Sequence, residues 1–239
     1  MKAEKISEHI WSLKSWMIVP IHVWIVIEED GVTLVDAGMP MMAKGIIKFI
    51  KQLNAGPLRR ILLTHGHSDH VGAIQKILLT QNNVPVYAHD IEIPYMEGTV
   101  LYPKRKKLEY NLPKQLAQPL TKSTHGKLQT IAGLTPYLTP GHSPGHVVYY
   151  HENDKVLLAG DLFNSKKGKL HPPMFTPYMD EVLQSSLIVK ELKPERLEVC
   201  HGNTVFRPAE QLEEYVQKTT RKLESLYIGE FHVSEKKMP

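Results

Sequence analysis

The order of apolar and polar positions along the chain predicts alternating strands and helices. Apolar, β-branched runs at residues 23–27 and 32–35 are separated by a turn containing an Asp-Gly pair, which is typical of a hairpin. Between residues 46 and 53, apolar side chains recur every three or four positions, as on one face of a helix. A short apolar run at 61–63 then precedes a second helical pattern at 71–78. This alternation is typical of an α/β protein.

The later part of the chain continues the pattern. Residues 92–127 are predicted to form an insertion with one or two short helices, because prolines interrupt them and no flexible Gly/Ser tract is present. Residues 164–177 are predicted to be a loop without regular structure. Two sheets covered outside by helices would bury the apolar runs within a single domain, residues 1–239. Further strands are predicted at 84–88, 128–131, 135–138, 147–150, 156–159 and 197–199, and helices at about 180–192 and 208–226.

Composition and charge exclude several classes of protein. The chain has 239 residues, 42% of them hydrophobic and 23% charged, as expected of a globular protein that needs no disulfides. A net charge of +4 is too small to predict nucleic-acid binding. The longest apolar stretch, 16–27, is broken by Pro20 and His22 and is shorter than the roughly 20 residues that span a bilayer. The N-terminus lacks a signal-peptide pattern, so we expect a cytoplasmic protein with no membrane partner. No oligomeric state is predicted.

Histidine is the unusual residue, because the chain contains 13, roughly twice what average composition gives. Residues 65–70 read His-Gly-His-Ser-Asp-His and lie between an apolar run and a helical pattern. They therefore occupy a loop at the carboxyl end of a strand, where α/β proteins commonly place ligands. A chance match to this pattern is on the order of one in a thousand. We expect His65 and His67 to face one cation and Asp69 and His70 a neighbouring one.

Two adjacent metal sites need more donors than this loop supplies. His142, Asp161 and His201 each follow an apolar run that ends near a strand's carboxyl end. Each residue alone would suit a structural role. Together with the loop at 65–70, they are predicted to complete the two sites.

These motifs, in this order, resemble the metallo-β-lactamase superfamily in its binuclear hydrolase branch. The resemblance covers about residues 18–206 and implies an αββα sandwich, with two mixed β-sheets, helices on the outer faces and metals at one edge. It implies a hydrogen bond from a ligand histidine to Asp36. It also implies that the first metal is held by His65, His67 and His142, the second by Asp69, His70 and His201, and both by a bridging Asp161.

Other residues near these motifs receive more limited predictions. His146 is expected to fix its loop by hydrogen bonding, with a ligand or proton-shuttle role as the alternative. Cys200 is expected to be a buried thiol that faces away from His201, because neighbouring strand residues alternate. The residues predicted to contact substrate are His22, Asn164 and Tyr178, with Trp16 at the mouth of the site.

The resemblance implies a hydrolase that acts on a small molecule. Two divalent ions, zinc with manganese or iron as alternatives, would hold a bridging hydroxide that attacks an ester, thioester or lactone, with Asp69 and Asp161 as the catalytic carboxylates. Zinc β-lactamases have cysteine or serine in place of Asp161, so penicillin hydrolysis is not expected. Acyl-homoserine lactonases have tyrosine where this chain has Asn164. Alternative functions are a phosphodiesterase or ribonuclease of the same fold, a non-catalytic metal-binding protein, and a mono-iron persulfide dioxygenase.

Overall fold

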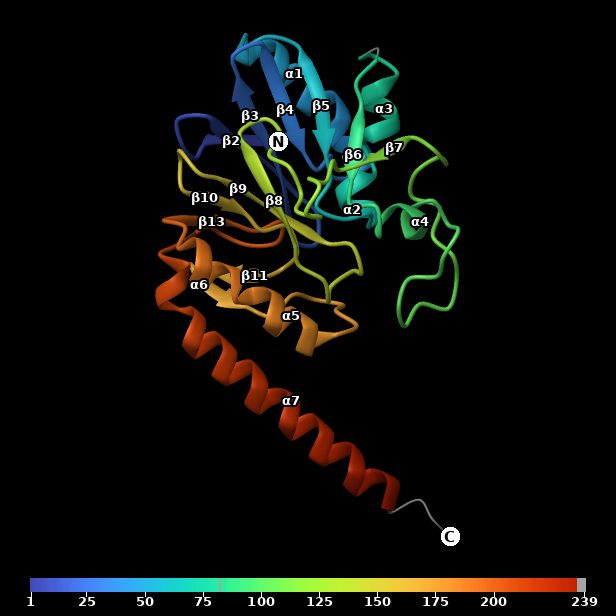
Figure 1. Cartoon of the computed structure of the whole chain (residues 1–239), viewed down its shortest axis with the longest axis vertical. Helices are drawn as coiled ribbons and strands as arrows, with labels where there is room; N and C mark the ends of the chain where they lie inside the picture. The colour runs from blue at the N-terminus through green and yellow to red at the C-terminus, as the bar shows by residue number, and fades with distance from the viewer. Residues whose placement is uncertain (82, 236–239) are drawn as a thin grey trace.

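Two β-sheets packed face to face form the centre of the molecule, and helices cover their outer sides (Figure 1). The computed structural model describes residues 1–81 and 83–235. The last four residues of the single domain predicted from the sequence lie outside that part. The arrangement confirms the αββα sandwich with two mixed sheets.

The first sheet has seven strands in chain order. Its first four strands pair antiparallel, and the last four pair parallel. The strands are β1 (Lys2–Lys5), β2 (Ile10–Trp16), β3 (Pro20–Glu28), β4 (Gly31–Val35), β5 (Leu58–Leu62), β6 (Val86–Ala88) and β7 (Ala117–Pro119).

The second sheet has five strands in the order β14-β13-β10-β9-β8, and only β10 and β13 run parallel. A separate two-stranded hairpin, β11–β12, lies beside it. The bounds are β8 (Leu134–Leu138), β9 (Val147–His151), β10 (Val156–Leu158), β11 (Asn164–Lys166), β12 (Lys169–His171), β13 (Arg196–Glu198) and β14 (Val205–Phe206).

The helices divide between the two outer faces. In Figure 1, α1 and α3 lie on the first sheet, and α5, α6 and the first turns of α7 lie on the second, whereas the rest of α7 projects away from the sandwich. The helices are α1 (Ala43–Leu53), α2 (Ser68–Val71), α3 (Ile74–Leu78), α4 (Ile93–Met96), α5 (Met179–Ser186), α6 (Ile188–Leu192) and α7 (Leu212–Glu235), with 3-10 turns at Pro40–Met42 and Pro208–Glu210. No helix in the described residues is both long and apolar enough to cross a bilayer.

The sandwich follows from side-chain alternation along the strands. On β10, Val156 and Leu158 join the core that contains the first sheet, whereas Leu157 joins the cluster that contains Val182 and Val189 of α5 and α6. Because successive side chains of a strand point to opposite faces, a wholly apolar strand must be covered on both sides. Burial of both faces therefore places the second sheet between the first sheet and α5–α7.

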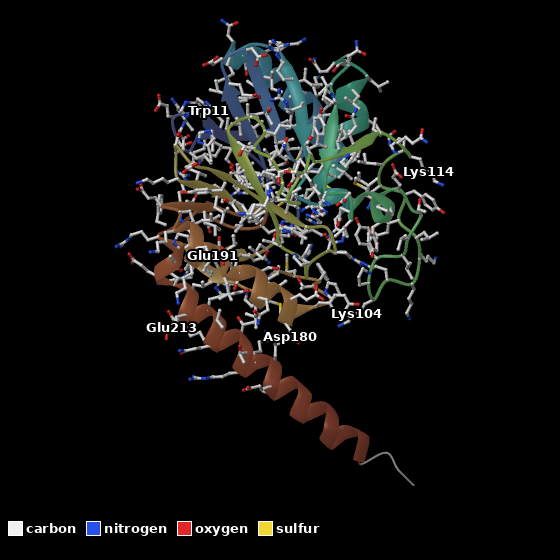
Figure 2. All side chains as sticks on the ribbon, viewed as in Figure 1. Trp11, Lys104, Lys114, Asp180, Glu191 and Glu213 are labelled. Carbon is white, nitrogen blue, oxygen red and sulfur yellow. The ribbon has the colours of Figure 1, made fainter. Side chains whose placement is uncertain are left out.

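Several predicted elements are corrected. Residues 128–131 make only isolated bridges and form no strand, and the predicted loop at 164–177 contains the β11–β12 hairpin. The insertion at 92–127 contains α4, as predicted, but also β7, which extends the first sheet. Lys104 and Lys114, labelled in Figure 2, lie on this outlying segment. The predicted helix at 180–192 is divided into α5 and α6.

Tyr149 connects the two sheets, since its buried hydroxyl on β9 donates a 2.8 Å hydrogen bond to the carbonyl of Leu63 after β5. Tyr149→Phe should lower the free energy of unfolding by about 1–3 kcal/mol, because that carbonyl would then lack its buried donor. Denaturant unfolding measures the change. The control is Tyr150→Phe on the same strand, where we expect less than about 0.5 kcal/mol. Equal effects of the two substitutions would contradict the connection.

Candidate metal centre

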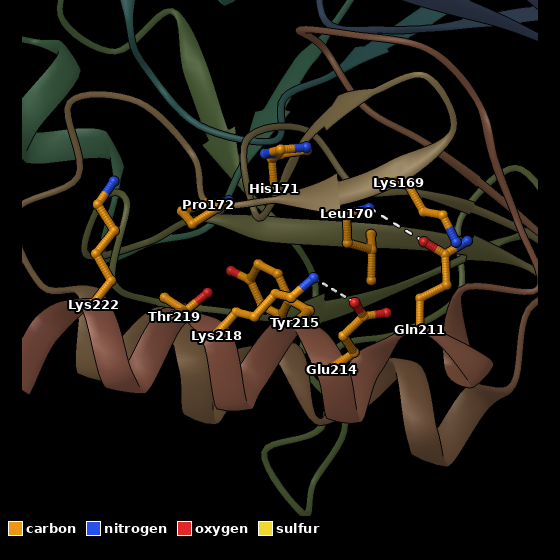
Figure 3. A pocket seen from close by; sticks show the side chains of 10 residues that line it. All are labelled: Lys169, Leu170, His171, Pro172, Gln211, Glu214, Tyr215, Lys218, Thr219 and Lys222. Atoms are coloured by element: carbon orange, nitrogen blue, oxygen red, sulfur yellow. Dashed lines mark hydrogen bonds and ion pairs between the residues drawn. The ribbon is translucent and has the colours of Figure 1, made fainter.

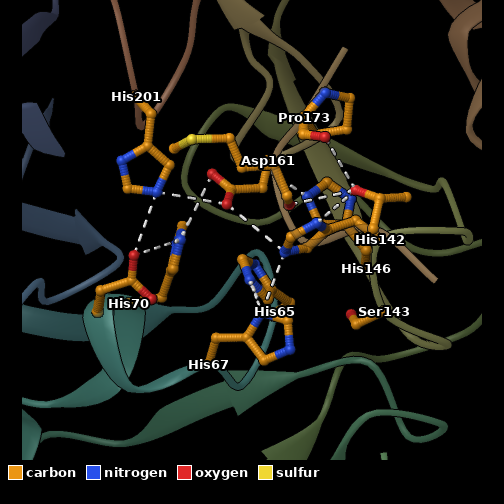
Figure 4. Close-up of polar contacts among 12 residues, drawn as sticks. His65, His67, His70, His142, Ser143, His146, Asp161, Pro173 and His201 are labelled. Carbon is orange, nitrogen blue, oxygen red and sulfur yellow. Dashed lines mark hydrogen bonds and ion pairs between the residues drawn. The ribbon is translucent and has the colours of Figure 1, made fainter. Parts of the chain in front are cut away.

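The predicted ligands lie at the carboxyl ends of strands from both sheets. His65 follows β5 closely, Asp161 follows β10, and His201 follows β13. His142 lies in the turn after β8, which has the same direction as β10 because both pair antiparallel with β9. The carboxyl ends of strands with a common direction meet at one edge of a sheet. This edge of each sheet therefore contributes part of one cluster (Figure 4).

Three imidazoles form the first group of donors. Nε2 of His65 lies 2.9 Å from Nδ1 of His67, which in turn lies 3.0 Å from Nε2 of His142. His65 is fully buried and His142 nearly so. Burial first, and then the neighbouring imidazoles of His70 and His67, hold the pKa of His65 well below its usual range. Neutral imidazoles with converging ring nitrogens are suited to binding a divalent metal.

The second group contains two histidines and two aspartates. Nε2 of His201 lies 3.1 Å from Oδ2 of Asp69 and 3.4 Å from Oδ2 of Asp161. Nε2 of His70 lies 3.5 Å from Oδ1 of Asp161 and 3.9 Å from Oδ2 of Asp69. Asp161 also reaches the first group, because its Oδ2 lies 3.5 Å from Nε2 of His142. Figure 4 shows Asp161 between the two groups.

Two buried atoms indicate that this cluster fits metal ions. Nε2 of His70 and Oδ1 of Asp161 are buried and, among the described residues, have no hydrogen-bond partner. Leaving such groups unpaired costs free energy unless a ligand satisfies them. Burial favours the neutral form of Asp161, but the positive charges of His201 and His70 hold its pKa well below the usual range. The fold and these donors thus fit divalent metal binding.

Asp36 fixes the orientation of His70 from the end of β4. Its Oδ2 accepts a 2.8 Å hydrogen bond from Nδ1 of His70, and Thr64 donates to both carboxylate oxygens through its amide and hydroxyl. Asp36 adopts a φ of 56°, a left-handed conformation that aspartate tolerates better than most residues. A metal ion at the cluster would be bound through Nε2 of His70, because the hydrogen bond to Asp36 keeps the proton of the neutral ring on Nδ1.

His146 positions the backbone of Asp161. Its Nε2 accepts a 3.1 Å hydrogen bond from the amide of Asp161, and its Nδ1 donates to the hydroxyl of Thr139. Both ring nitrogens are therefore engaged in fixing the loop. Gly160 permits this contact: its φ is 50°, and a Cβ there would lie 2.9 Å from Nε2 of His146 and 2.8 Å from Cβ of Thr64.

Glu92, which the sequence analysis did not identify, joins the two ligand loops from the start of α4. Its carboxylate is fully buried and accepts four hydrogen bonds. Oε1 accepts from the amide of Gly66 at 2.9 Å and the hydroxyl of Tyr102 at 2.7 Å. Oε2 accepts from the hydroxyl of Ser143 at 2.9 Å and the amide of Gly145 at 2.8 Å. The carboxylate thereby fixes His65–His67 relative to His142.

The predicted direction of the Cys200 side chain is wrong. The thiol is buried as expected, but its sulfur lies within 4.8 Å of candidate ligand atoms of His70, Asp161 and His201. Strand alternation does not apply here, because β13 ends at Glu198 and residues 200–201 are in a bend.

The residues predicted to contact substrate have different surroundings. Asn164 lines a cavity beside His201. His22 is buried on β3, where its Nδ1 lies 2.8 Å from the hydroxyl of Ser12, and it does not line the cavities described at the centre. Burial, together with the charge of Lys14, lowers the pKa of His22 to about 4.

Tyr178 is half exposed at the start of α5, and its ring lies 5.5 Å from Nζ of Lys104. Like His22, it does not line either of the two cavities at the centre.

The donor cluster is open to solvent through a pocket of about 160 Å³. The segment 92–127 contributes Arg105 and Glu109 to its walls, and the segment after β12 contributes Met174 and Phe175. Asp69 is the most open of the acidic ligands, with 30% of its side chain exposed. The predicted insertion at 92–127 and the predicted loop at 164–177 therefore both contribute to the walls of the site.

Comparisons with known proteins agree with this geometry. A family model described as the metallo-beta-lactamase superfamily matches residues 17–201. The probable metallo-hydrolase YybB of Bacillus subtilis is 38% identical over 222 residues, covering 90% of this chain and 98% of that protein. A hydroxyacylglutathione hydrolase of Francisella philomiragia is 27% identical over 177 residues, covering 72% of this chain but 60% of that protein.

A solved structure of a metallo-beta-lactamase family protein from Thermus thermophilus has the same fold, with a TM-score of 0.70 and 22% identity. The match covers 93% of this chain and 83% of that one. The fold and the edge cluster of histidines and aspartates define a metallo-β-lactamase-like protein. The chain belongs to the metallo-beta-lactamase superfamily.

Proposed function

We propose that this chain is a metal-dependent hydrolase that cleaves an ester, thioester or lactone in a small molecule. The observation that carries the proposal is the position of Asp161, whose Oδ2 lies 3.5 Å from His142 and 3.4 Å from His201, so that one carboxylate serves both donor groups. The names of two relatives, a probable metallo-hydrolase and a hydroxyacylglutathione hydrolase, support the reaction class.

In this proposal the candidate ligands have distinct roles. His65, His67 and His142 would hold one divalent ion, and Asp69, His70 and His201 would hold the other, with Asp161 lying between the two donor groups. Bound there, divalent ions would supply a water nucleophile at neutral pH and would polarise the substrate's carbonyl oxygen. Asp69, which is partly exposed in the pocket, orients the water and receives its proton.

The reaction balances with water as the only co-reactant. Water adds to the acyl carbon, the bond from that carbon to oxygen or sulfur breaks, and the leaving alcohol or thiol takes a proton. Zinc is the metal we propose first, because imidazole and carboxylate donors bind it well; the same donors accept manganese or iron.

Metal analysis combined with a substrate panel tests the proposal. We expect about two metal ions per purified chain, hydrolysis of activated esters, thioesters or lactones, loss of activity with a chelator, and recovery when zinc is added back. Bis-p-nitrophenyl phosphate serves as the comparison substrate. Cleavage of this diester alone would replace the proposal with phosphodiester hydrolysis, and two bound metals without turnover of any panel member would contradict hydrolysis.

A further inference from the structure

A cavity of about 410 Å³ opens beside the metal centre. Its walls come from the β2–β3 hairpin, the β11–β12 hairpin and the turn at 201–203. It shares Val19, Met174 and His201 with the smaller pocket that contains the candidate ligands. A substrate whose reacting bond lies at the ligands can therefore extend directly into this larger space.

The charged groups of this cavity are all basic. Among the described residues that line it, Lys14, Lys166 and His171 carry ionisable side chains beside His201, and none is aspartate or glutamate. Lys14 belongs to β2 and Lys166 to β11, so the two lysines reach the cavity from different hairpins. A cavity lined by one sign of charge attracts ligands of the other sign.

Other lining residues indicate the rest of the ligand. Trp16 is 68% exposed, which is unusual for so large an apolar side chain, and its ring centroid lies 5.8 Å from Nζ of Lys14. Asn164 adds an amide whose Oδ1 has no hydrogen-bond partner among the described residues. A few polar groups on a largely apolar wall are typical of small-molecule sites.

We propose, on the basis of the hydrolase function above, that this cavity binds the acyl part of the substrate and that this part carries a second, anionic group held by Lys14 and Lys166. The substrate class is then a mono-ester or mono-thioester of a dicarboxylic acid, or its phosphonate equivalent. The apolar chain between the two acyl ends lies against Trp16.

Two matched esters test this substrate class on the zinc-loaded protein. p-Nitrophenyl hydrogen glutarate carries a free carboxylate, and p-nitrophenyl pentanoate has the same chain without it. We expect kcat/KM to be at least about tenfold higher for the glutarate ester, with a preference that decreases as salt screens the lysines. The corresponding phosphonate ester, assayed beside them, shows which anion is preferred.

The double substitution Lys14→Gln/Lys166→Gln should remove the preference. We expect kcat/KM for the two esters to come within about twofold of each other, because the glutarate ester loses its advantage. Lys169→Gln is the matched control, because Lys169 lies opposite Lys166 in the same hairpin yet lines a different cavity, which Tyr215 of α7 also lines (Figure 3). This control should keep the full preference.

The outcomes separate the two proposals. Equal hydrolysis of both esters by the unmodified protein would overturn the anion site and leave the hydrolase function standing. No hydrolysis of either ester would count against the hydrolase function. Binding of glutarate and pentanoate, measured by calorimetry, then decides the anion site alone: tighter glutarate binding that the double variant loses supports it, and equal binding overturns it.

Discussion

Asp161→Ala should reduce the metal content from about two ions per chain to one or fewer and lower kcat/KM by at least about a thousandfold. The physical reason is the shared position of its carboxylate, which lies 3.5 Å from both His70 and His142 and 3.4 Å from His201. Loss of a residue that hydrogen-bonds a metal ligand typically lowers metal affinity or activity 10- to 100-fold. Loss of a residue that contacts both donor groups should therefore lower them further. Elemental analysis and steady-state kinetics on the same preparation measure both effects.

The fold of the variant must be checked separately, because Asp161 is buried beside three imidazoles. Asp161→Asn keeps the shape of the side chain and removes its charge, so circular dichroism and thermal unfolding of this variant distinguish lost metal from lost structure. Asp180→Asn, at the exposed start of α5, is the control and should change neither metal content nor rate. Full activity of Asp161→Ala with unchanged zinc would contradict the bridging role.

The sequence predicted that the donor side chains would lie together, because each donor follows a local pattern. The loop at 65–70 contains four of the donors within six residues, and His142, Asp161 and His201 each follow an apolar run. An apolar run predicts a strand, and strand ends of common direction meet at one edge, so local patterns were sufficient to expect the donors together. The structure places the seven side chains around one cluster.

Other features depend on contacts between distant segments. Glu92 acts on Gly66 and Ser143, 26 and 51 residues away, and nothing in its local sequence marks it as an acceptor. The edge strand β1 was not predicted because its four residues, Lys-Ala-Glu-Lys, are all exposed and follow no apolar pattern. Cys200 was assigned the wrong direction because strand alternation was assumed beyond the end of β13.

Glu92→Ala should lower the affinity of the first metal site by about 10- to 100-fold and the free energy of unfolding by roughly 3 kcal/mol or more. Removal of the carboxylate leaves four donors, those of Gly66, Tyr102, Ser143 and Gly145, without their acceptor. Two of these donors belong to the backbone of the loops that carry His65, His67 and His142. The first site should therefore lose its alignment, whereas His70 keeps its hydrogen bond to Asp36.

Glu92→Gln distinguishes positioning from simple loss of stability. Glutamine keeps one accepting oxygen and presents an NH₂ group where the other oxygen was, so the backbone amide on that side loses its acceptor, whereas the hydroxyl on that side can rotate and accept from the NH₂ group. We expect an intermediate loss of affinity at the first site, with the second site within about twofold of the unmodified protein, as resolved by zinc competition against a chromophoric chelator. Glu97→Gln is the control: Glu97 lies five residues along the same segment, and its carboxylate accepts the amide of Gln115 at 2.6 Å, away from both ligand loops. Equal weakening of both metal sites in Glu92→Gln would show that the carboxylate stabilises the fold as a whole, without a specific role in aligning His65, His67 and His142.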